Sequence, residues 1–290
     1  MSNINNSIVW TCENGKDFYP SRLVTKDIPK GIYSIKFSPE YGTYLSLLEF
    51  NDDKTTELLY ENFEEINDDF RKFLSLEEKY KKSGIEFNRA VLLHGHPGCG
   101  KKYLARRLAQ SFDGITLYAD EPEDLKRMVS LIKTNDSNAK ILVIIEEIGY
   151  LLEKNGITSV MEIFKSKENS DGVYIVATTN FEEKVNEYLA NKPGVFEEKI
   201  LVDYPEEEDR LKYITHLAKS LDIDIDKKRI AKISKDTEDL SLGHIKNLIE
   251  SVFLYDYHYD DKLEDIKKAK ENMLFSLYSA NNMNGIGFGD

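Results

Sequence analysis

The stretch that decides the fold is Gly95-His96-Pro97-Gly98-Cys99-Gly100-Lys101-Lys102. An apolar run, Ala90–His94, precedes it, and a run with helical spacing, Tyr103–Ala109, follows it. Between a strand and a helix, G-x-x-x-x-G-K is typical of a phosphate-binding loop, because its glycines let backbone N–H groups turn inward on an anion. The helix N-terminus adds partial positive charge, and Lys101 is expected to reach the outer phosphates. The alternative is a glycine-rich turn without a ligand.

The last position of this loop departs from the pattern. A serine or threonine normally follows the lysine, and its hydroxyl binds Mg²⁺. Here the position is Lys102, whose ammonium group cannot ligate a metal and repels a cation. It can instead lie against a phosphate oxygen and replace part of the metal's charge. The loop therefore favours nucleotide binding over efficient hydrolysis.

Composition sets the class of protein. The chain has 290 residues, of which 41% are apolar, so a substantial core can form. The formal net charge of -13 argues against broad nucleic-acid binding, which needs a basic surface. The positions of Cys12 and Cys99 do not favour a disulfide and indicate a reducing compartment. The first six residues lack the basic and apolar regions of a secretion signal, and the apolar run Ile141–Ile145 is too short to span a bilayer, so we expect a cytoplasmic protein.

Residues 1–55 are predicted to form a small β-rich unit. Alternating residues at 32–37, a turn at 38–42 and a strand-like run at 43–50 indicate a hairpin. Two interpretations are open: a contact for oligomers or partners, or an extra layer packed on the main domain. Helical spacing follows at 57–82, and its aromatic stripe is expected to be core.

The middle of the chain, 56–204, alternates strands and helices. Strands are predicted at 90–94, 114–118, 141–145, 172–177 and 199–202. This alternation predicts an α/β fold with a doubly wound parallel sheet, in which ligands bind at the carboxyl ends of the strands. The residues at those ends are Gly95, Glu146, Glu147 and Asn180.

From Pro205 onward the pattern is all helical, which predicts a small helical subdomain over 205–279. Its helices are expected at 206–221, 226–235, 242–257 and 260–279, with Ser241 as the N-cap of the third. Residues 280–290 have neither a helical nor a strand period and are predicted to be a flexible tail.

The order of these features resembles the AAA branch of the AAA+ ATPases, including AAA-type ATPases encoded by phages and bacteria. The resemblance covers about residues 60–275: the loop, the acidic pair after a buried strand, Thr178-Thr179-Asn180 after the next strand, and a helical lid. It implies a P-loop NTPase core that binds ATP and ADP, with Mg²⁺ as the usual metal.

The resemblance also implies roles for single residues. Glu147 matches the catalytic base that polarises the attacking water, and Asn180 matches the sensor asparagine that positions it. Glu146 matches the acid that orients a magnesium-bound water, although it is one methylene longer than the usual aspartate. The other nucleotide-binding positions are Gly84 and Ile85 near adenine, His96, Pro97, Gly98, Cys99, Gly100, Lys101, Lys102, Tyr103, and Leu242 and Gly243 of the lid.

Two segments depart from the family's pattern. The arginine-finger segment, usually R-P-x-R-F-D, has Lys192 and Val195 at its arginine positions, and lysine lacks the planar fork of arginine. After the second strand, where unfoldases have an aromatic-glycine pair, Tyr118 is followed by an acidic segment without glycine. Processive threading of a polypeptide is therefore not expected.

Two functions from different classes follow. The first is an ATP-binding AAA ATPase that forms a homo-oligomeric ring, or assembles with another AAA subunit, and remodels or assembles a protein partner with slow or partner-dependent hydrolysis. The second is a degenerate AAA module that binds nucleotide as an assembly switch without turnover. The intact base and sensor favour the first, and the substituted loop and finger positions favour the second. A DNA-handling role is weaker because of the acidic balance.

Overall fold

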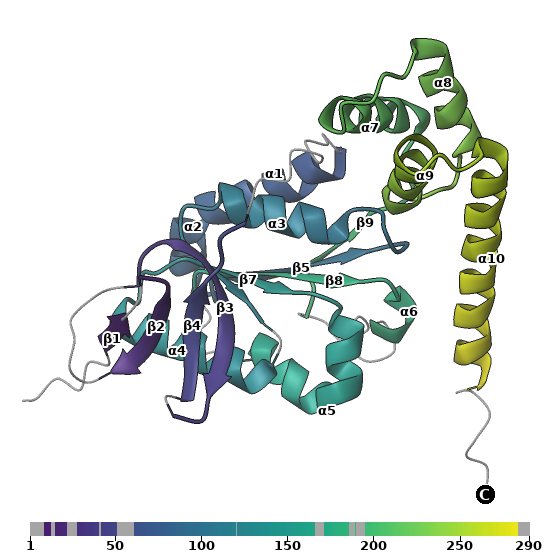
Figure 1. The fold of residues 1–290 in the computed structure, drawn as a ribbon. Coiled ribbons are helices and arrows are strands. Elements are labelled where there is room, and N and C mark those ends of the chain that lie inside the picture. The colour runs from purple at the N-terminus through teal and green to yellow at the C-terminus, as the bar shows by residue number, and fades with distance from the viewer. Residues whose placement is uncertain are drawn as a thin grey trace, which may run out of the picture. The chain divides into compact units, whose positions relative to one another are not determined.

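The structure is a computed structural model that describes residues 9–12, 15–21, 28–40, 42–50, 61–119, 121–165, 171–185, 189 and 195–283. The chain divides into two compact units, and among the described residues the boundary lies between Asp203 and Tyr204. The described part of the first unit contains a sheet with helices on it, and that of the second contains helices (Figure 1).

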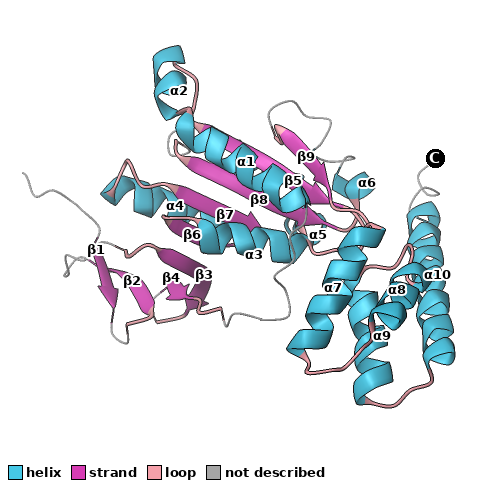
Figure 2. Ribbon diagram, turned by 90° about the horizontal axis from the view of Figure 1, so that it is seen from above, coloured by secondary structure: helices cyan, strands magenta, loops and turns pink. Residues whose placement is uncertain are grey.

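Among the described residues, five parallel strands form the centre of the first unit. They are β5 (Asn88–His94), β6 (Ile115–Tyr118), β7 (Ile141–Ile145), β8 (Val173–Thr179) and β9 (Glu198–Leu201), in the order β6-β7-β8-β5-β9 (Figure 2). β7 and β8 are buried along their whole length, as expected for a parallel sheet covered on both faces. The predicted doubly wound α/β sheet is confirmed.

Helices lie on both faces of this sheet. α1 (Glu61–Ser75) and α3 (Lys101–Ser111) cover one face, and α4 (Pro122–Asn135) and α5 (Ile148–Lys165) cover the other (Figure 1). Two shorter helices are α2 (Glu77–Ser83) and α6 (Glu182–Val185). Since β7 ends at Ile145 and α5 begins at Ile148, the acidic pair forms the turn between a strand and a helix.

The aromatic stripe of α1 is core, as predicted. Phe70 and Phe73 are buried, and their ring centroids lie 4.7 and 5.3 Å from that of Tyr174. On the same helix, Asp69 accepts hydrogen bonds from Arg89 Nε at 2.7 Å and from the Tyr174 hydroxyl at 2.7 Å. These contacts join α1 to the first residues of β5 and β8.

The N-terminal strands extend the same sheet. β3 (Gly31–Ser38) and β4 (Gly42–Leu47) form the predicted hairpin, and β1 (Val9–Cys12) and β2 (Asp17–Ser21), which the sequence pattern did not predict, continue it outward. β3 pairs in parallel with β6, so the full order is β1-β2-β4-β3-β6-β7-β8-β5-β9.

In its described residues, the β-rich unit predicted for 1–55 is a continuation of the core sheet. Tyr33 and Leu45 are fully buried in the same apolar cluster as Leu117 and Leu125. The physical reason is the edge of β6, whose backbone groups would lack partners without β3. Alternation in the sequence identifies a strand but not the strand with which it pairs.

The second unit contains α7 (Glu207–Ser220), α8 (Lys227–Asp236), α9 (Leu242–Leu254) and α10 (Tyr259–Met283). Ser241 caps α9 as predicted, because its hydroxyl accepts a hydrogen bond from the His244 N–H. Buried Arg210 donates to the carbonyl oxygens of Pro205 and Ser234 at 2.6 and 2.8 Å, which ties α7 to α8.

The end of α10 falls at Met283, past the helix end predicted at 279, and residues 284–290 of the predicted tail lie outside the described residues. In the part of the chain that the structure describes, no helix is both long enough and apolar enough to cross a membrane.

Candidate functional site

The glycine-rich loop joins β5 to α3. Gly95, Gly98 and Gly100 have φ angles of 134°, 79° and 101°, a region that favours glycine. At Gly95 a Cβ atom would lie 2.2 Å from the carbonyl oxygen of Val202, so only glycine lets the chain after β9 approach the loop this closely. The loop therefore has the left-handed turns from which an anion-binding nest of N–H groups is built.

Lys101 is the first residue of α3 and is only 4% exposed. Its Nζ donates 2.8 Å hydrogen bonds to the carbonyl oxygens of Gly95 and His96. Burial lowers the pKa of this amine. Because both acceptors are neutral, these two hydrogen bonds hold the cation in the loop without cancelling its charge.

Glu147 follows β7 with a left-handed backbone, at φ 51°. Its N–H donates to Thr178 Oγ1 at 3.1 Å, and its Oε1 accepts a hydrogen bond from Asn180 Nδ2 at 2.8 Å. A non-glycine residue in this conformation costs about 1–2 kcal/mol. The structure thus holds a carboxylate against an amide, at the carboxyl ends of β7 and β8, in a backbone conformation that local preferences oppose.

Lys102 and Glu146 form an ion pair, with Nζ 3.0 Å from Oε2. The Lys102 side chain is 58% exposed and that of Glu146 is 36% exposed. The hydrogen bond to Glu146 raises the pKa of Lys102. The residue that replaces the metal-binding hydroxyl is therefore joined to the acid expected to orient a metal-bound water.

The sequence did not predict a second set of polar contacts at this end of the sheet, which is centred on Glu182. His94, the last residue of β5, has Nδ1 2.7 Å from Glu182 Oε2, and Lys199 Nζ lies 3.8 Å from Glu182 Oε1. Burial lowers the pKa of His94 and outweighs Glu182, which acts in the opposite direction. A neutral imidazole satisfies the short contact by donating its Nδ1–H. The available sequence signal was a histidine that closes an apolar strand.

The remaining predicted nucleotide positions lie in different places. Around the loop, Cys99 is buried, His96, Pro97 and Tyr103 are partly buried, and Gly98 is exposed. Gly84 ends α2 in a left-handed cap, and Ile85 after it is 62% exposed. Leu242 and Gly243 belong to the first turn of α9 in the second unit. The adenine contacts inferred for these last four residues stay predictions.

The substituted finger position is an interior residue. Val195 is 2% exposed and belongs to the apolar cluster of the first unit, whereas Lys192 lies outside the described residues. At the end of β6, the ring centroid of Tyr118 lies 5.9 Å from that of Phe50, and Arg106 lies 4.1 Å above the Phe50 ring. Tyr118 therefore packs against the segment that follows β4.

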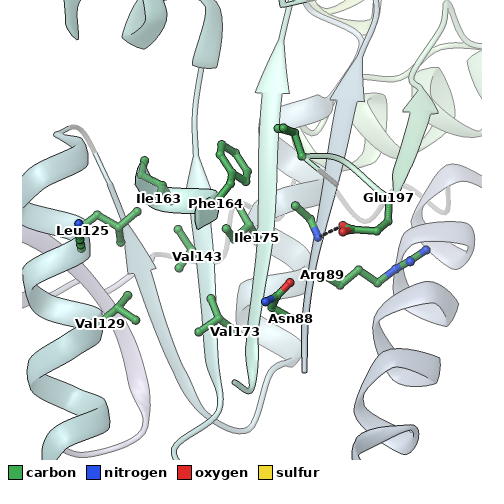
Figure 3. A pocket seen from close by; sticks show the side chains of 13 residues that line it. Asn88, Arg89, Leu125, Val129, Val143, Ile163, Phe164, Val173, Ile175 and Glu197 are labelled. Atoms are coloured by element: carbon green, nitrogen blue, oxygen red, sulfur yellow. Dashed lines mark hydrogen bonds between the residues drawn. The ribbon is translucent and has the colours of Figure 1, made fainter. Parts of the chain in front are cut away.

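A small cavity lies elsewhere, between the sheet and helices α4 and α5 (Figure 3). Its volume is about 30 Å³, room for one or two water molecules. Asn88, Arg89 and Val173 mark its position near the amino ends of β5 and β8, whereas the glycine-rich loop follows the carboxyl end of β5. Its size and place exclude it as the nucleotide site.

A parallel sheet with a glycine-rich loop before α3 and an acidic pair after β7 defines a P-loop nucleotide-binding core. The family model described as "ATPase family associated with various cellular activities (AAA)" matches residues 91–204. This match places residues 91–204 of the chain in the AAA+ ATPase superfamily.

Curated relatives agree with this assignment. The chain is 27% identical over 228 residues to the ATP-dependent zinc metalloprotease FtsH 1 of Bdellovibrio bacteriovorus, a match that covers 69% of this chain and 35% of the relative. It is 26% identical over 197 residues to the peroxisomal ATPase pex1 of Schizosaccharomyces pombe, covering 62% and 20%. It is 26% identical over 211 residues to the proteasome-activating nucleotidase of Methanopyrus kandleri, covering 65% and 48%. The chain thus spans less than half the length of each relative.

The side chains at the loop do not fit the metal that this superfamily usually binds. Mg²⁺ needs near-octahedral oxygen ligands, and the loop normally supplies a hydroxyl after its lysine. Lys102 has no lone pair to offer, and its ammonium group occupies an oxygen of Glu146. Within the described ranges, no group of three or more His, Cys, Asp or Glu side chains is arranged to hold a metal ion.

Proposed function

We propose that the chain binds ATP at Gly95–Lys102 and hydrolyses it slowly. The observation that carries this proposal is the 2.8 Å hydrogen bond between Glu147 and Asn180. It places a carboxylate and an amide at the same edge of the sheet as the buried Lys101. The names of two relatives, an ATP-dependent zinc metalloprotease and a peroxisomal ATPase, support ATP as the nucleotide.

Each residue has its own role in this proposal. The backbone N–H groups of the loop and the ammonium group of Lys101 hold the phosphates. Glu147 accepts a proton from the attacking water, a contribution worth about 10²–10⁴ in rate. Asn180 holds the Glu147 carboxylate in one orientation and leaves its second oxygen, Oε2, for the water.

Two features support slow turnover. Lys102 stands where a metal-binding hydroxyl normally stands, and Val195, at one finger position, is buried in its own subunit's core. A buried valine cannot reach into a neighbouring active site. In related systems an arginine finger is worth about 10³–10⁵ in rate. Hydrolysis that depends on a partner subunit is compatible with this loss.

We further propose that the protein acts as an oligomeric protein-remodelling or assembly factor. The relatives' names support this class, because they link ATP to a metalloprotease, an ATPase to peroxisomes and a nucleotidase to proteasome activation. Light scattering with no nucleotide, with ADP and with a nonhydrolysable ATP analogue tests it. A monomer under all three conditions contradicts the oligomeric part of the proposal.

The second candidate is a nucleotide-dependent assembly switch without turnover, and the Lys102–Glu146 ion pair favours it. ATP turnover measured with and without Mg²⁺, alongside a nucleotide-binding titration, separates the two. Binding with turnover supports the ATPase, binding without turnover supports the switch, and absence of binding contradicts both.

A further inference from the structure

We infer that this site takes a nucleoside triphosphate in its metal-free form, with the ammonium group of Lys102, steered by Glu146, in place of the divalent cation. The inference rests on the proposed nucleotide binding at Gly95–Lys102 and adds the chemical form of the ligand. It follows from the misfit between the residues at the loop and a magnesium ion.

The first argument is the donor set. In the usual P-loop arrangement a hydroxyl after the lysine and an aspartate hold the cation or its water. Here the first is an ammonium group with three donors and no acceptor, and the second is a glutamate whose Oε2 lies 3.0 Å from that ammonium group. A cation placed between Lys102 and Glu146 would therefore have one oxygen ligand fewer than in the usual P-loop, and the positive charge of Lys102 would repel it.

The second argument is the balance of charge. The two lysines of the loop and the two glutamates after β7 cancel each other in charge. With a neutral hydroxyl in place of Lys102, the same four positions would have one negative charge in excess, and a divalent cation would have to overcome it before a polyphosphate could bind. Lys102 removes that excess, so the phosphates meet a neutral site with two ammonium groups.

The third argument is the position of Lys102 in α3. Lys101 and Lys102 begin this helix, and its first turn has no acidic residue. A cation at a helix N-terminus is disfavoured by the helix dipole unless an anion lies beside it. Glu146 supplies one anion, and because a half-exposed ion pair is weak, Lys102 can turn from Glu146 to a phosphate oxygen at little cost.

The test is the affinity for a nonhydrolysable ATP analogue in excess Mg²⁺ and in EDTA, for the full chain and three variants. For the parent we expect the two affinities to agree within about threefold, less than the loss of one charged hydrogen bond. In Lys102→Thr with Glu146→Asp, which restores the usual residue types, removal of the metal should weaken binding by about tenfold or more. Lys102→Met alone should weaken binding in EDTA by a similar factor. This variant shows whether the loss comes from Lys102 and not from the change at Glu146.

The matched control is Lys126→Thr with Glu162→Asp. This pair has Nζ 2.7 Å from Oε2 and side chains 47% and 51% exposed, but it joins α4 to α5. It should leave both affinities as in the parent. Thermal unfolding of every variant reports whether the fold is kept.

Each outcome has one meaning. Parent binding that needs Mg²⁺ overturns the inference and leaves the proposed function standing. Equal affinities in the parent and in the double variant overturn the assignment to Lys102. Absence of binding in both conditions overturns the proposed function, and the inference with it.

Discussion

Asn180 Nδ2 donates a 2.8 Å hydrogen bond to Glu147 Oε1, across two neighbouring strands and 33 residues of sequence. The same turn is held by the Glu147 N–H, which donates to the buried Thr178 hydroxyl. Groups at the end of β8 thus fix both the carboxylate and the N–H of Glu147, while the backbone of this residue has a positive φ. A strained residue that its neighbours hold in place is a recurrent property of functional sites.

Replacement of Glu147 by glutamine should separate binding from turnover. The amide oxygen of the new side chain can still accept the Asn180 hydrogen bond, but it cannot take a proton, so the rate of ATP hydrolysis should fall by about 10²–10⁴. Nucleotide affinity should stay close to that of the parent. Steady-state phosphate release together with a binding titration checks this, and Glu162→Gln on α5 is the control. Equal rates for parent and Glu147→Gln would place the base elsewhere.

Lys101→Met should weaken nucleotide binding by about tenfold or more, because a charge-assisted hydrogen bond to phosphate is lost. Lys133 is the matched control, since it is 7% exposed and its Nζ also donates to a carbonyl oxygen, that of Ala139, but it lies at the end of α4. Lys133→Met should change stability without changing nucleotide affinity. Similar losses of affinity in both variants would contradict a direct role for Lys101.

The N-terminal strands should contribute to global stability. Leu45→Ala removes a fully buried side chain from the shared core and should lower the free energy of unfolding by about 2–5 kcal/mol. Phe37→Ala on the neighbouring strand, where the side chain is 68% exposed, should change it by no more than about 0.5 kcal/mol. Urea unfolding measures both. A small effect of Leu45→Ala would mean that the N-terminal strands unfold separately from the core.

His94 should make stability depend on pH. Burial lowers its pKa in the folded state, with Lys199 and Lys101 acting in the same direction and Glu182 against them. The unfolded chain therefore binds the proton first, and the free energy of unfolding should fall as the pH decreases below about 6.5. His94→Asn should lack this part of the pH dependence. Urea unfolding at several pH values, with exposed His258→Asn as control, checks the sign; a parent that gains stability on acidification in this range contradicts it.

Local sequence was sufficient to predict the elements of the parallel α/β core. The apolar run before Gly95 and the helical run after it form β5 and α3, and Glu146 and Glu147 directly follow a fully buried strand. Ser241 caps α9 because an N-cap needs only a short hydroxyl three residues from the N–H it satisfies. These features depend on neighbours within a few residues, so the types of the residues and the spacing of the apolar ones are sufficient to predict them.

Long-range packing in the tertiary structure determined which helices and strands contact one another. The pairing of β3 with β6 made the N-terminal strands part of the core, and the approach of Glu182 to His94 created a short polar contact that no motif indicated. The burial of Val195 likewise depends on the apolar cluster that it shares with residues of α5 and the sheet. Contacts between residues far apart in the chain form only when many weak packing interactions together outweigh the entropic cost of closing the intervening loop. The periodicity of a single segment does not depend on these interactions and therefore cannot predict which distant segments will pack together.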